Sequence, residues 1–110
     1  MSVEELPEVT PEQAVALVAE GTLLVDVREQ DEWDVGHAPD ARLVPLSELT
    51  QRVAELPRDT RFLVVCHSGM RSMRATTFLR AEGLDAVNVT GGMVAWSQAG
   101  GALTANAPEA

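Results

Sequence analysis

One stretch decides how this chain folds: Phe62-Leu63-Val64-Val65-Cys66-His67-Ser68-Gly69-Met70-Arg71-Ser72. Its first four residues form a short, continuously apolar run, which is typical of a strand buried on both faces of a parallel sheet. The residues from Ser72 to Glu82 suit a helix, and Gly83 suits a helix end. The only cysteine of the chain therefore lies at the carboxyl end of a strand, where open α/β sheets place their ligands.

The polar turn that follows the predicted strand suits a nucleophilic cysteine; we call residues 66–71 the Cys66 loop. The thiolate, not the thiol, is the nucleophile, and both a helix N-terminus and a nearby cation favour it. Arg71 brings a permanent positive charge to the end of this loop, and His67 brings another when protonated. Gly69 allows an unusual dihedral or the close approach of a ligand. We therefore predict that the loop activates Cys66 and binds an anion.

Strands and helices alternate along the rest of the chain. We expect helices over residues 11–20, 29–35, 46–56 and 92–99, and strands over 23–27, 42–44 and 86–89. The first helix has a distinct start, because Thr10 is followed directly by Pro11 and three residues later by Gln13. This alternation predicts an α/β fold with a central parallel sheet flanked by helices on both faces.

The length of 110 residues predicts one domain. We expect an N-terminal extension over residues 1–8, the domain over 9–100, and a mobile C-terminal tail over 101–110, where the residues are small and weakly patterned.

The composition excludes several classes of partner. The net charge is −9, and all eight basic residues are arginines, so nucleic acids and anionic membranes are not expected to bind. The N-terminus lacks the pattern of a secretory signal and no apolar run approaches membrane-spanning length, so we expect a cytoplasmic protein. One cysteine and two histidines do not make a usual structural zinc site, and we expect no metal or other cofactor.

Two further blocks accompany the Cys66 loop, one upstream and one downstream. The upstream block is Asp26-Val27-Arg28-Glu29, then Glu32, Gly36-His37-Ala38-Pro39-Asp40-Ala41 and Val44-Pro45; the downstream block is Gly91-Gly92-Met93-Val94-Ala95-Trp96. In this order the three blocks resemble the rhodanese family of sulfurtransferases, whose loop runs cysteine, two variable residues, glycine, one variable residue, arginine and a small residue. The chain departs from the family at Asp40, usually glycine, and at Leu43, often asparagine.

The resemblance implies a function and assigns roles to residues. It implies that sulfane sulfur moves from a donor such as thiosulfate to cyanide or a thiol through a persulfide on Cys66. Cys66 and Arg71 would be catalytic, and the rest of the substrate- and persulfide-binding loop would be His67, Ser68, Gly69, Met70 and Ser72. Supporting, mainly structural roles fall to Asp26, Arg28 and His37. His67 occupies a variable position of the family's loop, so a chemical role for it stays open.

Two alternatives remain beside this interpretation. Related phosphatase and arsenate reductase domains place five residues between the cysteine and the arginine, whereas this chain places four there, which favours sulfur transfer over those activities. The second alternative is a module that relays sulfur from a protein donor, or only binds a protein, without turning over small donors. The expected partners are therefore a small sulfur donor and a thiol or cyanide acceptor, or a protein in either place.

Overall fold

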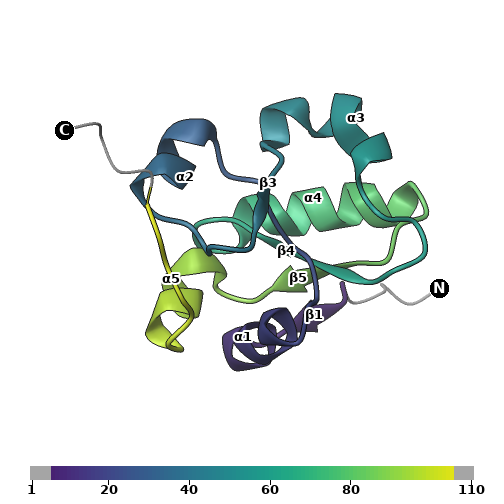
Figure 1. Cartoon of the computed structure of the whole chain (residues 1–110). Coiled ribbons are helices and arrows are strands. Elements are labelled where there is room, and N and C mark those ends of the chain that lie inside the picture. The colour runs from purple at the N-terminus through teal and green to yellow at the C-terminus, as the bar shows by residue number, and fades with distance from the viewer. Residues whose placement is uncertain (1–5, 106–110) are drawn as a thin grey trace.

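The computed structural model describes residues 6–105 and shows a five-stranded, fully parallel sheet (Figure 1). The strands are β1 (Glu8–Val9), β2 (Leu24–Asp26), β3 (Arg42–Leu43), β4 (Phe62–Val65) and β5 (Ala86–Val89), in the spatial order β1-β5-β4-β2-β3. The helices are α1 (Pro11–Ala19), α2 (Gln30–Val35), α3 (Leu49–Arg52), α4 (Met70–Ala81) and α5 (Gly92–Gln98), with short 3-10 helices η1 (Leu46–Glu48) and η2 (Val53–Glu55) around α3. The predicted α/β fold is confirmed.

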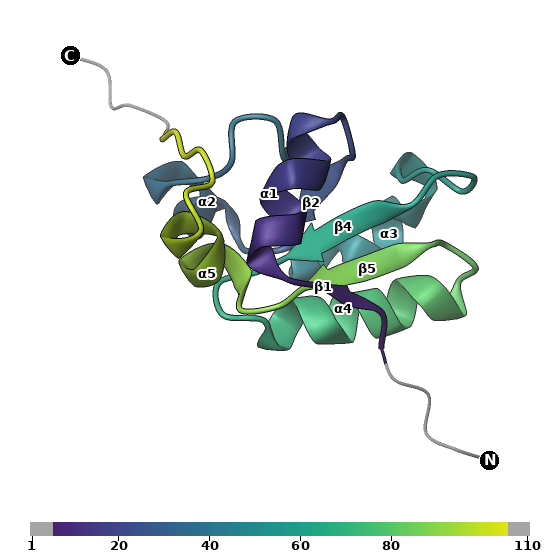
Figure 2. The same cartoon turned by 90° about the horizontal axis from the view of Figure 1, so that it is seen from below.

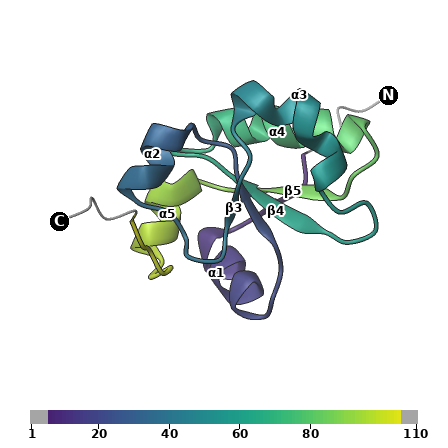
Figure 3. The same ribbon diagram turned by 45° about the horizontal axis from the view of Figure 1, so that its top comes forward.

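Helices cover both faces of this sheet. α1 and α5 pack on one face (Figure 2), and α3 and α4 lie on the opposite face (Figure 3). Central strand β4 is buried throughout and sends alternate side chains to the two sides: Phe62 and Val64 join the core under α3 and α4, and Leu63 and Val65 join the core under α1 and α5. This two-sided burial explains the continuous apolar run in the sequence.

Short sequence patterns predicted most of the boundaries of helices and strands. Thr10 and Gln13 form the predicted capping box, with the Gln13 backbone N–H donating to Thr10 Oγ1 at 3.0 Å. The helix expected over residues 46–56 is instead divided into η1, α3 and η2. Helix α4 begins at Met70 rather than Ser72, because the left-handed backbone of Gly69 starts it. Strand β1 was not predicted, and it corrects the expected N-terminal extension at Glu8, which pairs with Asn88 of β5 in the sheet.

The expected tail requires a correction at its first residues. Trp96 donates its indole N–H to the carbonyl of Ala102 at 2.9 Å, and the backbones of His37 and Thr104 form a two-way antiparallel bridge at 2.8 Å. A buried tryptophan needs such an acceptor, which the residues after α5 provide. The segment over 101–104 therefore runs from α5 to α2 as part of the domain (Figure 1), while residues 106–110 of the expected tail lie outside the described residues.

No helix within residues 6–105 is both long enough and apolar enough to cross a membrane.

Candidate active site

Cys66 directly follows β4 and lies below the N-terminus of α4. The Gly69 backbone N–H donates to the Cys66 Sγ atom at 3.1 Å, and Gly69 reaches this position with a φ of 115°. Ser72, which is fully buried, donates its hydroxyl to the Gly69 carbonyl at 3.2 Å and so fixes the turn from within. The positive end of α4 and one N–H group therefore face the sulfur, an arrangement that favours negative charge there.

The N-terminus of α5 supports the Cys66 loop from the other side. The backbone N–H groups of Met93 and Val94 donate to the carbonyls of Cys66 and His67 at 2.7 and 3.1 Å. Gly92 makes this contact possible, because a Cβ atom there would lie 2.4 Å from the His67 carbonyl oxygen. The shape of the loop thus depends on carbonyl oxygens that turn toward α5, which leaves the Gly69 N–H directed at the sulfur.

Arg71 forms a two-pronged ion pair with Glu32, a residue of α2. Its two terminal nitrogens lie 2.7 Å from the two Glu32 carboxylate oxygens. Hydrogen bonding to Arg71 lowers the pKa of Glu32 to about 2, and the same contact raises the pKa of Arg71 above its ordinary value. Glu32 also accepts from the Glu29 backbone N–H at 3.0 Å, so the carboxylate joins the start of α2 to the end of the Cys66 loop.

The three residues predicted to support the site hold α2 in place. Arg28 is buried and makes a two-pronged contact with the Asp26 carboxylate, with Nη2 at 2.8 Å from Oδ2, and it also donates to the Gly36 carbonyl at 2.7 Å. His37 donates its Nδ1 proton to the Trp33 carbonyl at 2.8 Å, and its ring stacks on Trp33 with centroids 3.7 Å apart. None of these contacts reaches the sulfur.

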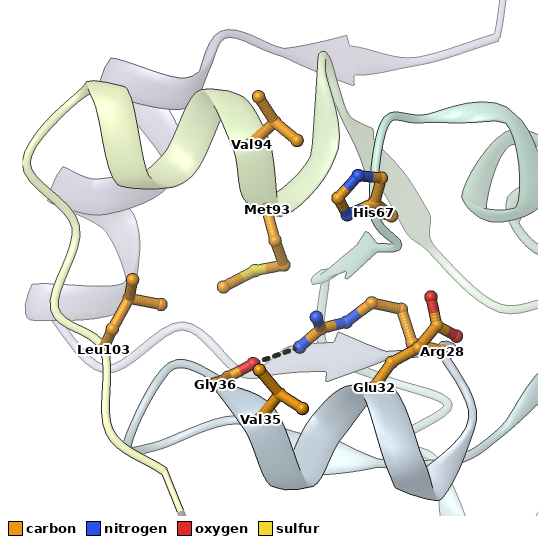
Figure 4. Close-up of a pocket in the computed structure, with 8 residues that line it drawn as sticks. All are labelled: Arg28, Glu32, Val35, Gly36, His67, Met93, Val94 and Leu103. Atoms are coloured by element: carbon orange, nitrogen blue, oxygen red, sulfur yellow. Dashed lines mark hydrogen bonds between the residues drawn. The ribbon is translucent and has the colours of Figure 1, made fainter.

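A cleft of about 520 Å³ opens beside the Cys66 loop (Figure 4). Its walls come from α2, the Cys66 loop, α5 and the C-terminal segment, and the lining residues are Arg28, Glu32, Val35, Gly36, His67, Met93, Val94 and Leu103. The Met93 side chain points into the space between α5 and α2 (Figure 4). The His67 imidazole is exposed at this cleft and has no hydrogen-bond partner among residues 6–105. Ser68 and Met70 are also exposed, whereas Cys66 is only 1% exposed.

Comparison with known proteins identifies the family. The sequence model of the rhodanese-like domain matches residues 10–99. The chain belongs to the rhodanese-like domain family. A sulfurtransferase of Allochromatium vinosum is 38% identical over 91 residues, which is 82% of this chain and 83% of that protein. The thiosulfate sulfurtransferase GlpE of Pseudomonas syringae pv. syringae is 33% identical over 93 residues, 84% of this chain and 88% of that protein.

A solved structure extends the likeness to three dimensions. The rhodanese-related protein of Thermoplasma volcanium superposes with a TM-score of 0.81 at 30% identity, covering 89% of this chain and 97% of that one.

Sequence analysis of this rhodanese-like domain missed two parts of the site. Glu32 was recognised only as a member of the upstream block, and its contact with Arg71 spans 39 residues. The wall that Leu103 contributes was missed because residues 101–110 were expected to be mobile. Within residues 6–105 no group of three or more histidine, cysteine, aspartate or glutamate side chains is placed to hold a metal ion. The described groups offer the Cys66 thiol, the Gly69 amide that donates to its sulfur, and two paired guanidinium groups, those of Arg28 and Arg71.

Proposed function

We propose that this protein is a sulfurtransferase that moves sulfane sulfur from a donor such as thiosulfate to cyanide or a thiol through a persulfide on Cys66. The observation that carries the proposal is the Gly69 N–H donor 3.1 Å from the Cys66 sulfur at the N-terminus of α4. Such a donor favours the thiolate that starts the reaction and the anionic persulfide that follows it. The sulfurtransferases among the relatives support the same reaction class.

In the first half-reaction Cys66 receives a sulfur atom from the donor. The Cys66 thiolate attacks the outer sulfur of thiosulfate, the sulfur–sulfur bond of the donor breaks, and sulfite leaves with the electron pair. Cys66 then carries an anionic persulfide, with Arg71 beside it as the permanent cation of the loop. In the second half-reaction an acceptor nucleophile attacks the outer sulfur of the persulfide, and the Cys66 thiolate is the leaving group. No external oxidant or reductant is needed in either half.

Intact-mass measurement tests this proposal directly. The reduced protein is incubated with thiosulfate in the absence of added thiol, beside a Cys66→Ser control that keeps a small hydrogen-bonding side chain under Gly69. We expect the wild type alone to gain the mass of one sulfur atom and to lose it on addition of cyanide. A wild type that gains no mass from thiosulfate or from inorganic polysulfide, while iodoacetamide still alkylates Cys66, would refute the persulfide reaction.

The phosphatase alternative requires a different observation. In the Cys66 loop, one amide, that of Gly69, points at the sulfur, whereas the carbonyls of Cys66 and His67 point toward α5. Release of phosphate from an aryl phosphate by the wild type, and not by Cys66→Ser, would revive that activity.

A further inference from the structure

The large apolar side chains that stay exposed are gathered around the Cys66 loop. Among residues 6–105 there are five of them, each between 41% and 82% exposed: Val35, Met70, Met73, Val94 and Leu103. Val35, Val94 and Leu103 line the cleft, and Met70 and Met73 lie on the first turn of α4, which begins where the loop ends. We call these five side chains the apolar rim. Clustered exposure of this kind marks interaction surfaces in proteins that otherwise bury such residues.

The charges around the apolar rim do not favour small anions. Asp26 pairs with Arg28, the arginine that lines the cleft, and Glu32 pairs with Arg71 at the end of the Cys66 loop, so neither arginine offers an uncompensated charge. Helix α2 adds the carboxylates of Asp31 and Asp34, and the exposed arginine in the first half of α4 is Arg74. With a net charge of −9 over the chain, the surface attracts a partner of positive charge.

The extent of the apolar rim distinguishes a protein partner from a small thiol. A small thiol has room in the cleft of about 520 Å³, but it would leave Met70 and Met73 on α4 uncovered. A protein segment that enters the cleft can cover α4 as well as α2, α5 and the C-terminal segment.

We propose that the apolar rim is the docking surface for a second protein, which presents a cysteine to Cys66 on a segment with apolar side chains and net positive charge. This inference rests on the proposed persulfide chemistry and names its acceptor. The partner's thiol loses its proton to solvent, and the thiolate attacks the outer sulfur of the Cys66 persulfide. The bond between that sulfur and Cys66 Sγ breaks, its electron pair stays on Cys66, and the partner's cysteine leaves as the persulfide.

Three synthetic peptides test this inference. One carries a cysteine between leucines and lysines, the second has glutamates in place of the lysines, and the third has serines in place of the leucines. The Cys66 persulfide is preformed with inorganic polysulfide, freed of excess reagent and mixed with each peptide while intact masses are followed. Each rate is divided by the peptide's rate with a small disulfide in free solution, because lysines also increase the thiolate fraction of the peptide. We expect the leucine–lysine peptide to react at least tenfold faster than either of the others.

Substitutions on the apolar rim provide the second arm. Val35→Asn and Leu103→Asn should each lower the rate with the leucine–lysine peptide at least threefold, and Met73→Asn, on α4 outside the cleft, should do so while leaving the rate of discharge by cyanide unchanged. Ala54→Asn, at an exposed site on η2, is the matched control and should change neither rate.

The outcomes separate this inference from the proposed function. A persulfide that cyanide discharges, but that the three peptides discharge equally fast, would overturn the docking surface alone. So would a wild-type dimer that Leu103→Asn converts to a monomer, since a second copy of the chain would then occupy the apolar rim. Failure of the persulfide to form at all would instead count against the proposed function.

Discussion

Arg71 shows how one contact changes the charge that a residue presents to a substrate. A free arginine at the end of the loop would present a full positive charge to an anion, but here Glu32 shares that charge at 2.7 Å. The guanidinium still has a fixed position beside the loop, because a two-pronged contact sets its plane as well as its distance. In the proposed reaction Arg71 would therefore either stabilise the anionic sulfur directly or neutralise Glu32.

A pair of variants distinguishes these two roles of Arg71. Arg71→Met should lower kcat/KM for thiosulfate at least tenfold, about 1.4 kcal/mol of transition-state stabilisation. If Arg71 acts on the sulfur, the double variant Arg71→Met with Glu32→Gln should remain within about threefold of the single variant. Recovery of the double variant to nearly wild-type kcat/KM would show instead that Arg71 serves only to neutralise Glu32.

The lowered pKa of Glu32 makes the contribution of this ion pair to stability depend on pH. Its value of about 2 in the folded protein lies below the ordinary value of 4.5 that we expect in the unfolded chain. The unfolded state therefore binds more protons as the pH falls from 4.5 toward 2, and the stabilisation present above pH 4.5 is lost over that interval. Since both side chains are one-third exposed, solvent screening reduces this contribution to about 1 kcal/mol.

Urea unfolding at several pH values checks this expectation. Glu32→Gln should be less stable than the wild type at pH 6 by about 1 kcal/mol, and the difference should shrink as the pH is lowered below 4.5. Parallel stability curves for the two proteins down to the lowest pH at which both fold would show that the pair contributes nothing.

At the scale of elements, the Cys66 loop is held between the ends of two helices. Helix α4 directs the Gly69 N–H at the sulfur, and α5 binds the carbonyls of Cys66 and His67. These two sets of hydrogen bonds fix opposite sides of the same short backbone segment. A substitution at the start of α5 can therefore alter the surroundings of the Cys66 sulfur without contacting the sulfur itself.

Gly92 offers a test of this support. Gly92→Ala places a Cβ atom 2.4 Å from the His67 carbonyl oxygen, at a φ of +64°. Gly100→Ala is the control, because its φ of +85° is also left-handed but no atom lies within 4 Å of the added carbon. We expect the control to lose about 1 kcal/mol of unfolding free energy from backbone strain alone. The unfolding free energy of Gly92→Ala should fall by about 2 kcal/mol more than that of the control, because of the clash with the His67 carbonyl. The same variant should form the Cys66 persulfide at least tenfold more slowly than the wild type. Equal losses in the two variants would show that the loop moves freely away from α5.

Local sequence predicted those elements whose signals are local. The apolar run of β4, the capping box of α1 and the Cys66 loop each consist of neighbouring residues, and each was located from them. Strand β1, the segment over 101–104 and the Glu32–Arg71 pair depend on contacts between residues distant in sequence. Propensity and periodicity carry no information about such contacts, because both are properties of a short window.

For the molecule as a whole, charge is the dominant long-range property. The net charge of −9 opposes the approach of thiosulfate, a dianion, while the paired arginines of the site add no net attraction. Close to the sulfur, in contrast, the Gly69 N–H and the N-terminus of α4 favour an anion. Repulsion at a distance and stabilisation at contact respond differently to salt, since screening acts mainly beyond about 10 Å at 0.1 M ionic strength.

Salt dependence therefore provides the last prediction. Raising NaCl from about 20 to about 200 mM should increase the second-order rate of persulfide formation from thiosulfate about two- to fivefold, because the repulsive field is screened. Alkylation of Cys66 by neutral iodoacetamide is the control and should stay constant. The leucine–lysine peptide should show the opposite trend and discharge the persulfide more slowly as salt rises, because screening weakens its attraction to the acidic surface. A thiosulfate rate that falls with salt would mean that the local field of the Cys66 loop, rather than the charge of the whole molecule, governs the approach of the donor.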